Sequence, residues 1–262
     1  MSARAPFDLA GWQRQPGRRT VQGVVERALS RIDGNRPVTV RGAGRTDAGV
    51  HAEAQVADCD VATDADDARL RHSLGRLLPP DVRPVGVRTV PASFSARRHA
   101  VSKTYAYTFD FTPWGDPFLA RYALHLGRPP DRERLRRALE RLPGRRDWSG
   151  FTAADTTVRN RVRRVVRAEL VDAGPARAAI VFTGDGFLRH MVRNLVGTIV
   201  EIERGRMEVE RIDRILASGD RRLAGPTAPA HGLCLTEVAY GRATMTPAMM
   251  PDEDENEDED DG

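Results

Sequence analysis

The chain has 262 residues and is 40% hydrophobic, which is enough for one large domain or two small ones around a buried core. No apolar run approaches the roughly 20 residues that a membrane-spanning helix needs, and the N-terminal stretch MSARAPFDLAGWQRQ lacks the apolar core of a secretory signal. The two cysteines, Cys59 and Cys234, match no metal spacing. We therefore expect a cytoplasmic protein with two free thiols and no membrane partner.

Charge is distributed unevenly along the chain. The formal net charge is +4, but the final stretch PDEDENEDEDDG carries nine acidic residues and no basic one. Without those nine charges the rest of the chain is at +13, and Lys103 is its only lysine among 41 basic residues. A body so rich in arginine favours polyphosphate partners, because the guanidinium fork matches phosphate geometry. We expect residues 246–262 to form a disordered acidic tail, since like charges repel and nothing there can be buried.

The front of the chain predicts a helix and then a series of strands. Apolar residues at helical spacing predict a helix over 21–32, capped by Thr20. Strands are predicted at 36–45 and 51–61, on either side of a glycine-rich turn, and again at 82–90. Clean alternation then predicts a strand over 103–111, with its aromatic residues on one face: Tyr105, Tyr107, Phe109 and Phe111.

The rest of the chain mixes helices and strands without regular alternation. A helix is predicted at 131–142, capped by Asp131, and the strand predicted at 158–171 places Arg159, Arg161 and Arg163 on one face. Then follow, in order, a strand at 177–188, helices at 189–205 and 208–218, and a strand at 233–241. This order favours an α+β fold over a doubly wound parallel sheet. A weak boundary near 93–101 suggests two α+β halves, 1–97 and 98–245.

The glycine turn RGAGRTDAGVHAEAQ, at 41–55, holds the most unusual combination of residues. Asp47 stands where a dinucleotide fingerprint needs glycine or alanine, and Val50 and His51 replace the Lys and Ser/Thr of a P-loop. No metal-ligand cluster and no G-x-S-x-G nucleophile motif is present in the sequence. Two interpretations of Asp47 stay open. It caps the turn by bonding backbone amides, or Arg45 keeps it charged and accessible as a nucleophile or base.

The stretch AGRTDAGVHA, at 43–52, resembles the signature of the TruA family of tRNA pseudouridine synthases. Six further blocks resemble that family in order, so that the resemblance spans about residues 8 to 242: GWQRQ, LLPPDV, FSARRHAVSKTYAY, DWSGFT, FLRHMVRNLVGTI and APAHGLCLTEVAY. It implies a pseudouridine synthase fold, in which two α+β halves share a continuous mixed, mainly antiparallel sheet with a central cleft. It also implies an isomerase that needs no cofactor or metal, acts on tRNA at nucleotides 38 to 40 of the anticodon stem-loop, and forms a homodimer.

The resemblance also implies roles for single residues. Asp47 matches the family's nucleophile, and Arg193 matches the arginine that pairs with that aspartate. The sequence leaves open whether the carboxylate attacks C1′, attacks C6 of the base or removes a ribose proton. Tyr105 matches the residue that stacks on the target base, and Arg45 one that displaces the base. On spacing alone, Tyr105 is equally a core residue and Arg193 a solvated helix charge.

For the RNA-binding surface, alternation along the predicted strand favours Arg161 and Arg163. Two other functions stay open alongside the anticodon-loop enzyme. One is a non-catalytic RNA-binding protein of the same fold, and the other is the same chemistry on a different RNA.

Overall fold

The computed structural model describes residues 2–3 and 8–241, so the predicted acidic tail at 246–262 lies outside the described residues. Within them, nine strands form one sheet in the order β5-β1-β3-β11-β6-β10-β9-β8, with β7 joined to β6. All neighbours are antiparallel except β3 with β11 and β6 with β7. The predicted α+β class, with a mixed and mainly antiparallel sheet, is confirmed.

The strands differ greatly in length. Three long ones form the centre of the sheet: β6 (Ala100–Asp110), β9 (Val162–Asp172) and β10 (Arg177–Gly184), with β11 (Leu233–Tyr240) beside them. The others are short: β1 (Ser2–Ala3), β3 (His51–Ala52), β5 (Val82–Arg83), β7 (Leu124–His125) and β8 (Gly144–Asp147). A separate two-stranded sheet joins β2 (Arg41–Gly42) to β4 (Ala57–Asp58).

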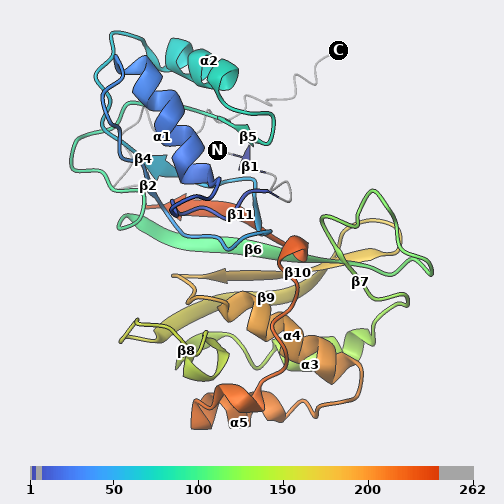
Figure 1. Cartoon of the computed structure of the whole chain (residues 1–262). Helices are drawn as coiled ribbons and strands as arrows, with labels where there is room; N and C mark the ends of the chain where they lie inside the picture. The colour runs from blue at the N-terminus through green and yellow to red at the C-terminus, as the bar shows by residue number, and fades with distance from the viewer. Residues whose placement is uncertain (1, 4–7, 242–262) are drawn as a thin grey trace, which may run out of the picture.

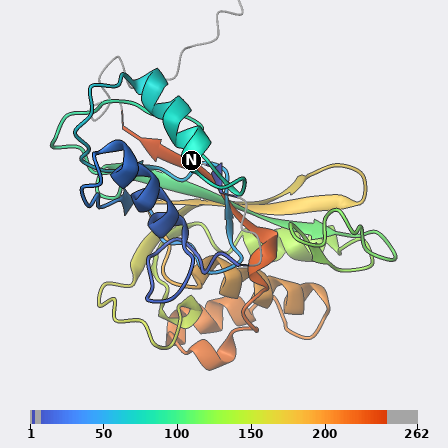
Figure 2. The ribbon, with the colours of Figure 1, turned by 45° about the horizontal axis from the view of Figure 1, so that its top comes forward.

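The helices gather at the two ends of the strand order (Figures 1 and 2). Helices α1 (Val21–Ile32) and α2 (Asp67–Leu77) lie beside the end that holds β5 and β1. At the other end lie α3 (Arg132–Leu139), α4 (Met191–Glu203) and α5 (Arg211–Ser218). Short 3₁₀ turns follow β8 and flank the approach to β11: η1 (Ser149–Phe151), η2 (Arg221–Leu223) and η3 (Ala230–Gly232).

Two hydrophobic clusters stabilise these groups of elements. One joins α1 and α2 to the loops around them, from Leu9 to Val82. The larger one packs α4 against β6 and β10, and it buries all four aromatic residues of the predicted strand face, Tyr105 to Phe111. The sheet runs through both groups, because β11 returns from the end of the chain to lie between β3 and β6. The division of the chain into two halves, 1–97 and 98–245, stays a prediction.

Helix predictions agree with the structure apart from one omission. The helices expected at 21–32, 131–142, 189–205 and 208–218 are present, and Thr20 and Asp131 cap theirs through Gly23 N and Arg134 N. Helix α2 was not predicted, although Asp66 caps it and Leu70 and Leu74 form its buried stripe. Because α2 buries only two residues and carries many charges, its periodicity is weak.

Several predicted strands are wrong in extent. The strand expected at 82–90 ends after Arg83, since Pro84 removes a backbone donor and Gly86 and Pro91 favour a loop. The strands at 36–45 and 51–61 shrink to two-residue pairings, and the second divides between both sheets. The strand expected at 158–171 begins only at Val162, so Arg159 and Arg161 precede it and strand alternation does not place them.

Candidate active site

The turn that carries Asp47 lies between β2 and β3 and is braced by the loop before α1. Trp12 N donates to Thr46 O at 3.0 Å, and the ring of Trp12 packs on Gly42, where a Cβ would come within 2.5 Å of it. Gly11, at φ +85°, approaches so closely that a Cβ would lie 2.6 Å from Thr46 O. Gly11 and Trp12 of the block GWQRQ therefore hold the turn that carries Asp47, and glycine is required at both contacts.

The side chain of Gln55 closes the turn from the other side. Its amide donates to Gly44 O at 2.9 Å, and its carbonyl accepts from Gly44 N at 3.4 Å. Val50 N donates to the backbone oxygen of Asp47 at 3.1 Å. Among the described residues no backbone amide bonds the Asp47 carboxylate, so the capped-turn interpretation of this side chain is not what the structure shows.

Asp47 instead meets residues from the start of α4. Arg193 Nη1 donates to Asp47 Oδ2 at 3.1 Å, and Arg193 Nε donates to Ala228 O at 2.8 Å. The side chain of Asp47 is 33% exposed and that of Arg193 is 16% exposed. An arginine 146 positions later in the chain thus pairs with a carboxylate that stays accessible to a substrate.

His190 is a further member of the site that the sequence did not suggest. Its Nε2 lies 3.3 Å from Asp47 Oδ2, the same oxygen that Arg193 contacts. The backbone of His190 is left-handed, with φ 61°, immediately before α4. This conformation is unusual for a residue other than glycine. It stands three residues before Arg193 in the sequence but outside α4, so its contact with Asp47 depends on this left-handed residue, which no sequence pattern indicates.

Tyr105 lies behind Asp47 on β6. It is 7% exposed and packs edge-on against Phe187, with ring centroids 5.3 Å apart. Burial raises the pKa of its hydroxyl, and the charge of Asp47 raises it further. Tyr105 is therefore a core residue that also lies close to the carboxylate, and its stacking on the target base stays a prediction.

The three other arginines named from the sequence have different surroundings. Arg45 is exposed, and its side chain makes no hydrogen bond or ion pair with any described residue. Arg161 donates to Val158 O at 3.4 Å, in the loop before β9. Arg163 lies on β9 next to Gly186. The pKa of Lys103 is lowered mainly by burial, then by the charge of Arg97, and third by the charge of Arg163.

Lys103 was not among the candidates, yet its side chain lies beside the turn that carries Asp47. Its Nζ lies 3.7 Å from the position a Cβ on Gly44 would take. Lys103 and Arg163 thus place positive charge beside Gly44, which favours a phosphate-bearing substrate. Within residues 2–3 and 8–241, no group of three or more His, Cys, Asp or Glu side chains is placed to hold a metal ion.

This geometry fixes what the site can do. One oxygen of the Asp47 carboxylate lies against two cationic or donor groups, while no described residue donates a hydrogen bond to Oδ1. A carboxylate so arranged is suited to act as a nucleophile or base on a substrate that enters from solvent. Together with the mainly antiparallel sheet and the signature turn, it is consistent with the pseudouridine synthase class that the sequence resembles.

Comparison with known proteins agrees with this class. The family model described as tRNA pseudouridine synthase matches residues 8–92 and 138–241. The chain is 41% identical over 235 residues to tRNA pseudouridine synthase A of Streptococcus sanguinis, covering 89% of this chain and 94% of that one. It is 42% identical over 234 residues to the protein of the same name from Streptococcus mutans, with the same coverage. The chain belongs to the tRNA pseudouridine synthase family and is an isomerase.

One solved structure gives a weaker overlap. A crystal structure of a Cbf5-Nop10-Gar1 complex covers 90% of this chain and 55% of its own, with 12% identity and a TM-score of 0.36. At that level the overlap carries no argument. In the part of the chain that the structure describes, no helix is long and apolar enough to cross a membrane.

Proposed function

We propose that this protein converts uridine to pseudouridine at nucleotides 38 to 40 of the tRNA anticodon stem-loop, with Asp47 as the nucleophile. The observation that carries the proposal is the contact of the partly exposed Asp47 carboxylate with Arg193, across 146 positions of sequence. The signature around Asp47 and the membership of the family support the chemistry. The choice of nucleotides rests on the resemblance to the TruA family.

The reaction exchanges one bond of the nucleoside for another. The bond from N1 of uracil to C1′ breaks, the base turns, and a bond from C5 to C1′ forms, while C5 loses a proton and N1 gains one. Because electrons and atoms balance within the substrate, the step needs no oxidant and no second substrate. Asp47 Oδ1, which accepts no hydrogen bond from the described residues, is the oxygen that we assign to the attack.

The remaining residues serve to hold the extruded base. Flipping a nucleotide out of its stack costs a few kcal/mol, and stacking on an aromatic ring returns about 1–3 kcal/mol. We assign the ring to Tyr105, which lies within the electrostatic reach of Asp47. Arg45 is exposed and without a side-chain partner among the described residues, so it is available to fill the gap in the stack.

The test uses a tRNA transcript that carries tritium at C5 of its uridines. We expect the protein to release tritium, and carbodiimide-blocked primer extension to stop at nucleotides 38 to 40 and nowhere else. Stops at other nucleotides of the tRNA, or ribosomal RNA stops that disappear in a deletion strain, contradict the choice of site. No tritium release, with tRNA still bound, favours the non-catalytic RNA-binding protein.

We also propose that the protein acts in the cytoplasm as a homodimer. The loop between β6 and β7 exposes Trp114 at 95% and Phe118 at 87%, a degree of aromatic exposure that often marks an interface. We assign this loop to contact with a second copy. Sedimentation should give a dimer for the native chain and a monomer for Trp114→Ser/Phe118→Ser. Val166→Ser, which changes an exposed apolar residue on β9, should leave the dimer intact.

A further inference from the structure

The structure contains a strongly basic cavity outside the catalytic turn. A cavity of about 820 Å³ follows α1, and we call it the α1 groove. Its charged lining consists of five arginines and one carboxylate: Arg14, Arg18, Arg19, Arg27, Arg31 and Glu26. Such an excess of positive charge along one helix favours a polyanion over a single small ion.

Three of these arginines have no counter-charge among the described residues. Arg19 pairs with Asp81 at 2.7 Å and with Asp8 at 2.9 Å. Arg14 lies 3.5 Å from Glu26. The side chains of the other three make no hydrogen bond or ion pair with any residue that the structure describes: Arg18, Arg27 and Arg31. The groove therefore keeps most of its positive charge for a ligand.

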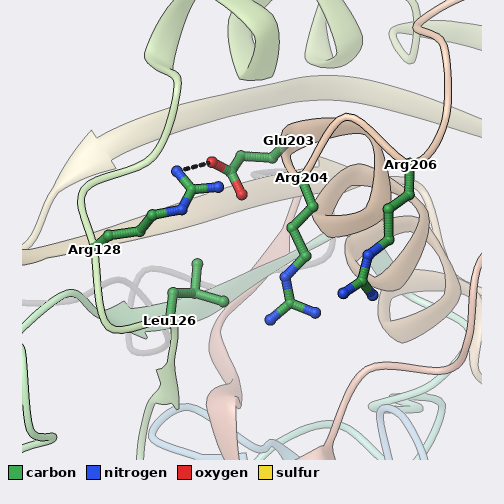
Figure 3. A pocket seen from close by; sticks show the side chains of 5 residues that line it. All are labelled: Leu126, Arg128, Glu203, Arg204 and Arg206. Carbon is green, nitrogen blue, oxygen red and sulfur yellow. Dashed lines mark ion pairs between the residues drawn. The ribbon is translucent and has the colours of Figure 1, made fainter.

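A second arginine-lined cavity shows the contrast. Figure 3 shows this smaller cavity, of about 380 Å³, at the end of α4. There Arg128 is directed at Glu203, 2.8 Å away, and the guanidinium groups of Arg204 and Arg206 lie 3.7 and 3.3 Å from Glu201. Each cation of that cavity has a carboxylate beside it, so little charge remains for an external anion.

Two of the three unpaired arginines, Arg27 and Arg31, share one face of α1. Arg27 and Arg31 stand four residues apart on α1, which places them one turn apart on the same side. Gly23 lies one turn before Arg27, and a Cβ there would come within 3.6 Å of Arg27 Nη1. The missing side chain leaves the floor of the groove clear for a ligand to lie along the helix.

The α1 groove is also joined to the catalytic turn. In the loop that begins at Gly11, the backbone oxygens of Gly11 and Trp12 accept hydrogen bonds from Val21 N at 3.1 Å and Gln22 N at 2.9 Å. These bonds hold the first turn of α1. The same loop donates from Trp12 N to Thr46 O, next to Asp47. An RNA strand with one nucleotide at Asp47 thus has the α1 groove as a neighbouring basic surface.

We propose that the α1 groove binds the phosphate backbone of the RNA substrate, away from the nucleotide that reacts. The proposal rests on the proposed function, since it adds a second contact surface for the same RNA. Guanidinium groups bind phosphate oxygens with two parallel hydrogen bonds, and each phosphate contact releases condensed counterions. Arg27 and Arg31 then contribute to affinity and not to the chemical step.

The experiment compares the full chain with Arg27→Gln/Arg31→Gln. Binding of labelled full-length tRNA is measured by fluorescence anisotropy at several salt concentrations. We expect affinity to fall roughly 5- to 10-fold per lost contact, and the slope of log affinity against log salt to become shallower by about 0.9 per contact on a duplex. The rate of tritium release at saturating tRNA should stay unchanged, while KM rises.

The matched control is Arg204→Gln/Arg206→Gln, which removes the same charge from the cavity of Figure 3. It should bind tRNA like the native chain, with the same salt slope. Equal losses in both double variants, or unchanged or tighter binding by Arg27→Gln/Arg31→Gln, overturn the proposal. If the native chain releases no tritium, the proposed function fails. If it does and the α1-groove variant binds normally, only the groove assignment fails.

Discussion

Arg193 holds two partners at once, the Asp47 carboxylate through Nη1 and the Ala228 oxygen through Nε. A lysine at this position could make one of these contacts but not both, because its single ammonium lacks the guanidinium fork. We expect Arg193→Lys to lower the rate of tritium release at saturating tRNA by about 100-fold, the typical cost of one misplaced electrostatic partner. Affinity for tRNA should stay within twofold. A native rate for the variant would contradict the positioning role.

His190 makes stability depend on pH. Burial lowers its pKa below the ordinary 6.5, Asp47 works in the opposite direction, and Arg193 and Arg189 lower it again. As pH falls below 6.5, the unfolded chain takes up a proton that native His190 resists, so this group costs stability in acid. The unfolding free energy of the native chain, minus that of His190→Gln, should therefore decrease from pH 7.5 to pH 5.5 in urea titrations. An increase over the same interval would contradict this sign.

At the residue scale, sequence reasoning found the residues that a motif names and missed those that only the fold brings in. Asp47 and Arg193 belong to the signature and to the block FLRHMVRNLVGTI, and the structure joins them. His190 precedes Arg193 in that block, but its approach to Asp47 depends on a left-handed backbone that no pattern announces. The role of Trp12, packed on Gly42, depends likewise on a contact between distant loops.

Helix α4 positions Arg193 through a close approach that glycine alone permits. A Cβ on Gly197 would lie 1.7 Å from Pro226 O, in the segment that leads to Ala228. Gly197→Ala must therefore displace α4 or this segment, and we expect a loss of at least about 2–3 kcal/mol in the free energy of unfolding. Turnover should fall as well, since Ala228 O orients Arg193.

The control at this scale is Gly75→Ala in α2, where no atom lies within 4 Å of the new Cβ. It should leave stability unchanged or raise it by about 0.5–1 kcal/mol, because alanine is the better helix former. Urea denaturation of both variants provides the comparison. Equal midpoints for the two would show that the contact at Pro226 does not constrain α4.

Elements with a strong apolar period were predictable, and short ones were not. A helix was predicted at 189–205, and the apolar residues that recur at helical spacing in α4 are all buried: Met191, Leu195, Ile199 and Ile202. The strands β2, β3 and β4 have only two residues each and so no period to detect, and β3 pairs with the distant β11. The proline and glycine residues between 84 and 91 disfavour a strand. The prediction of a strand at 82–90 gave them too little weight and was wrong beyond Arg83.

At the scale of the whole molecule, the order of strands determines the site. Because β11 lies between β3 and β6, the turn before β3 is brought beside Tyr105 on β6 and the start of α4. The order of the predicted helices and strands indicated the α+β class, but not that the last strand would be inserted between two earlier ones. Such an insertion is a matter of long-range pairing, for which local propensity gives no information.

The central claim is that Asp47 performs the chemistry and is not needed to hold the RNA. Its most direct test is tritium release from C5-labelled tRNA by the native chain and by Asp47→Asn, with tRNA affinity measured in parallel. We expect release by the native chain, none by Asp47→Asn, and nearly equal affinity of both for tRNA. Release by Asp47→Asn at the native rate, or a loss of binding as large as the loss of turnover, would contradict it.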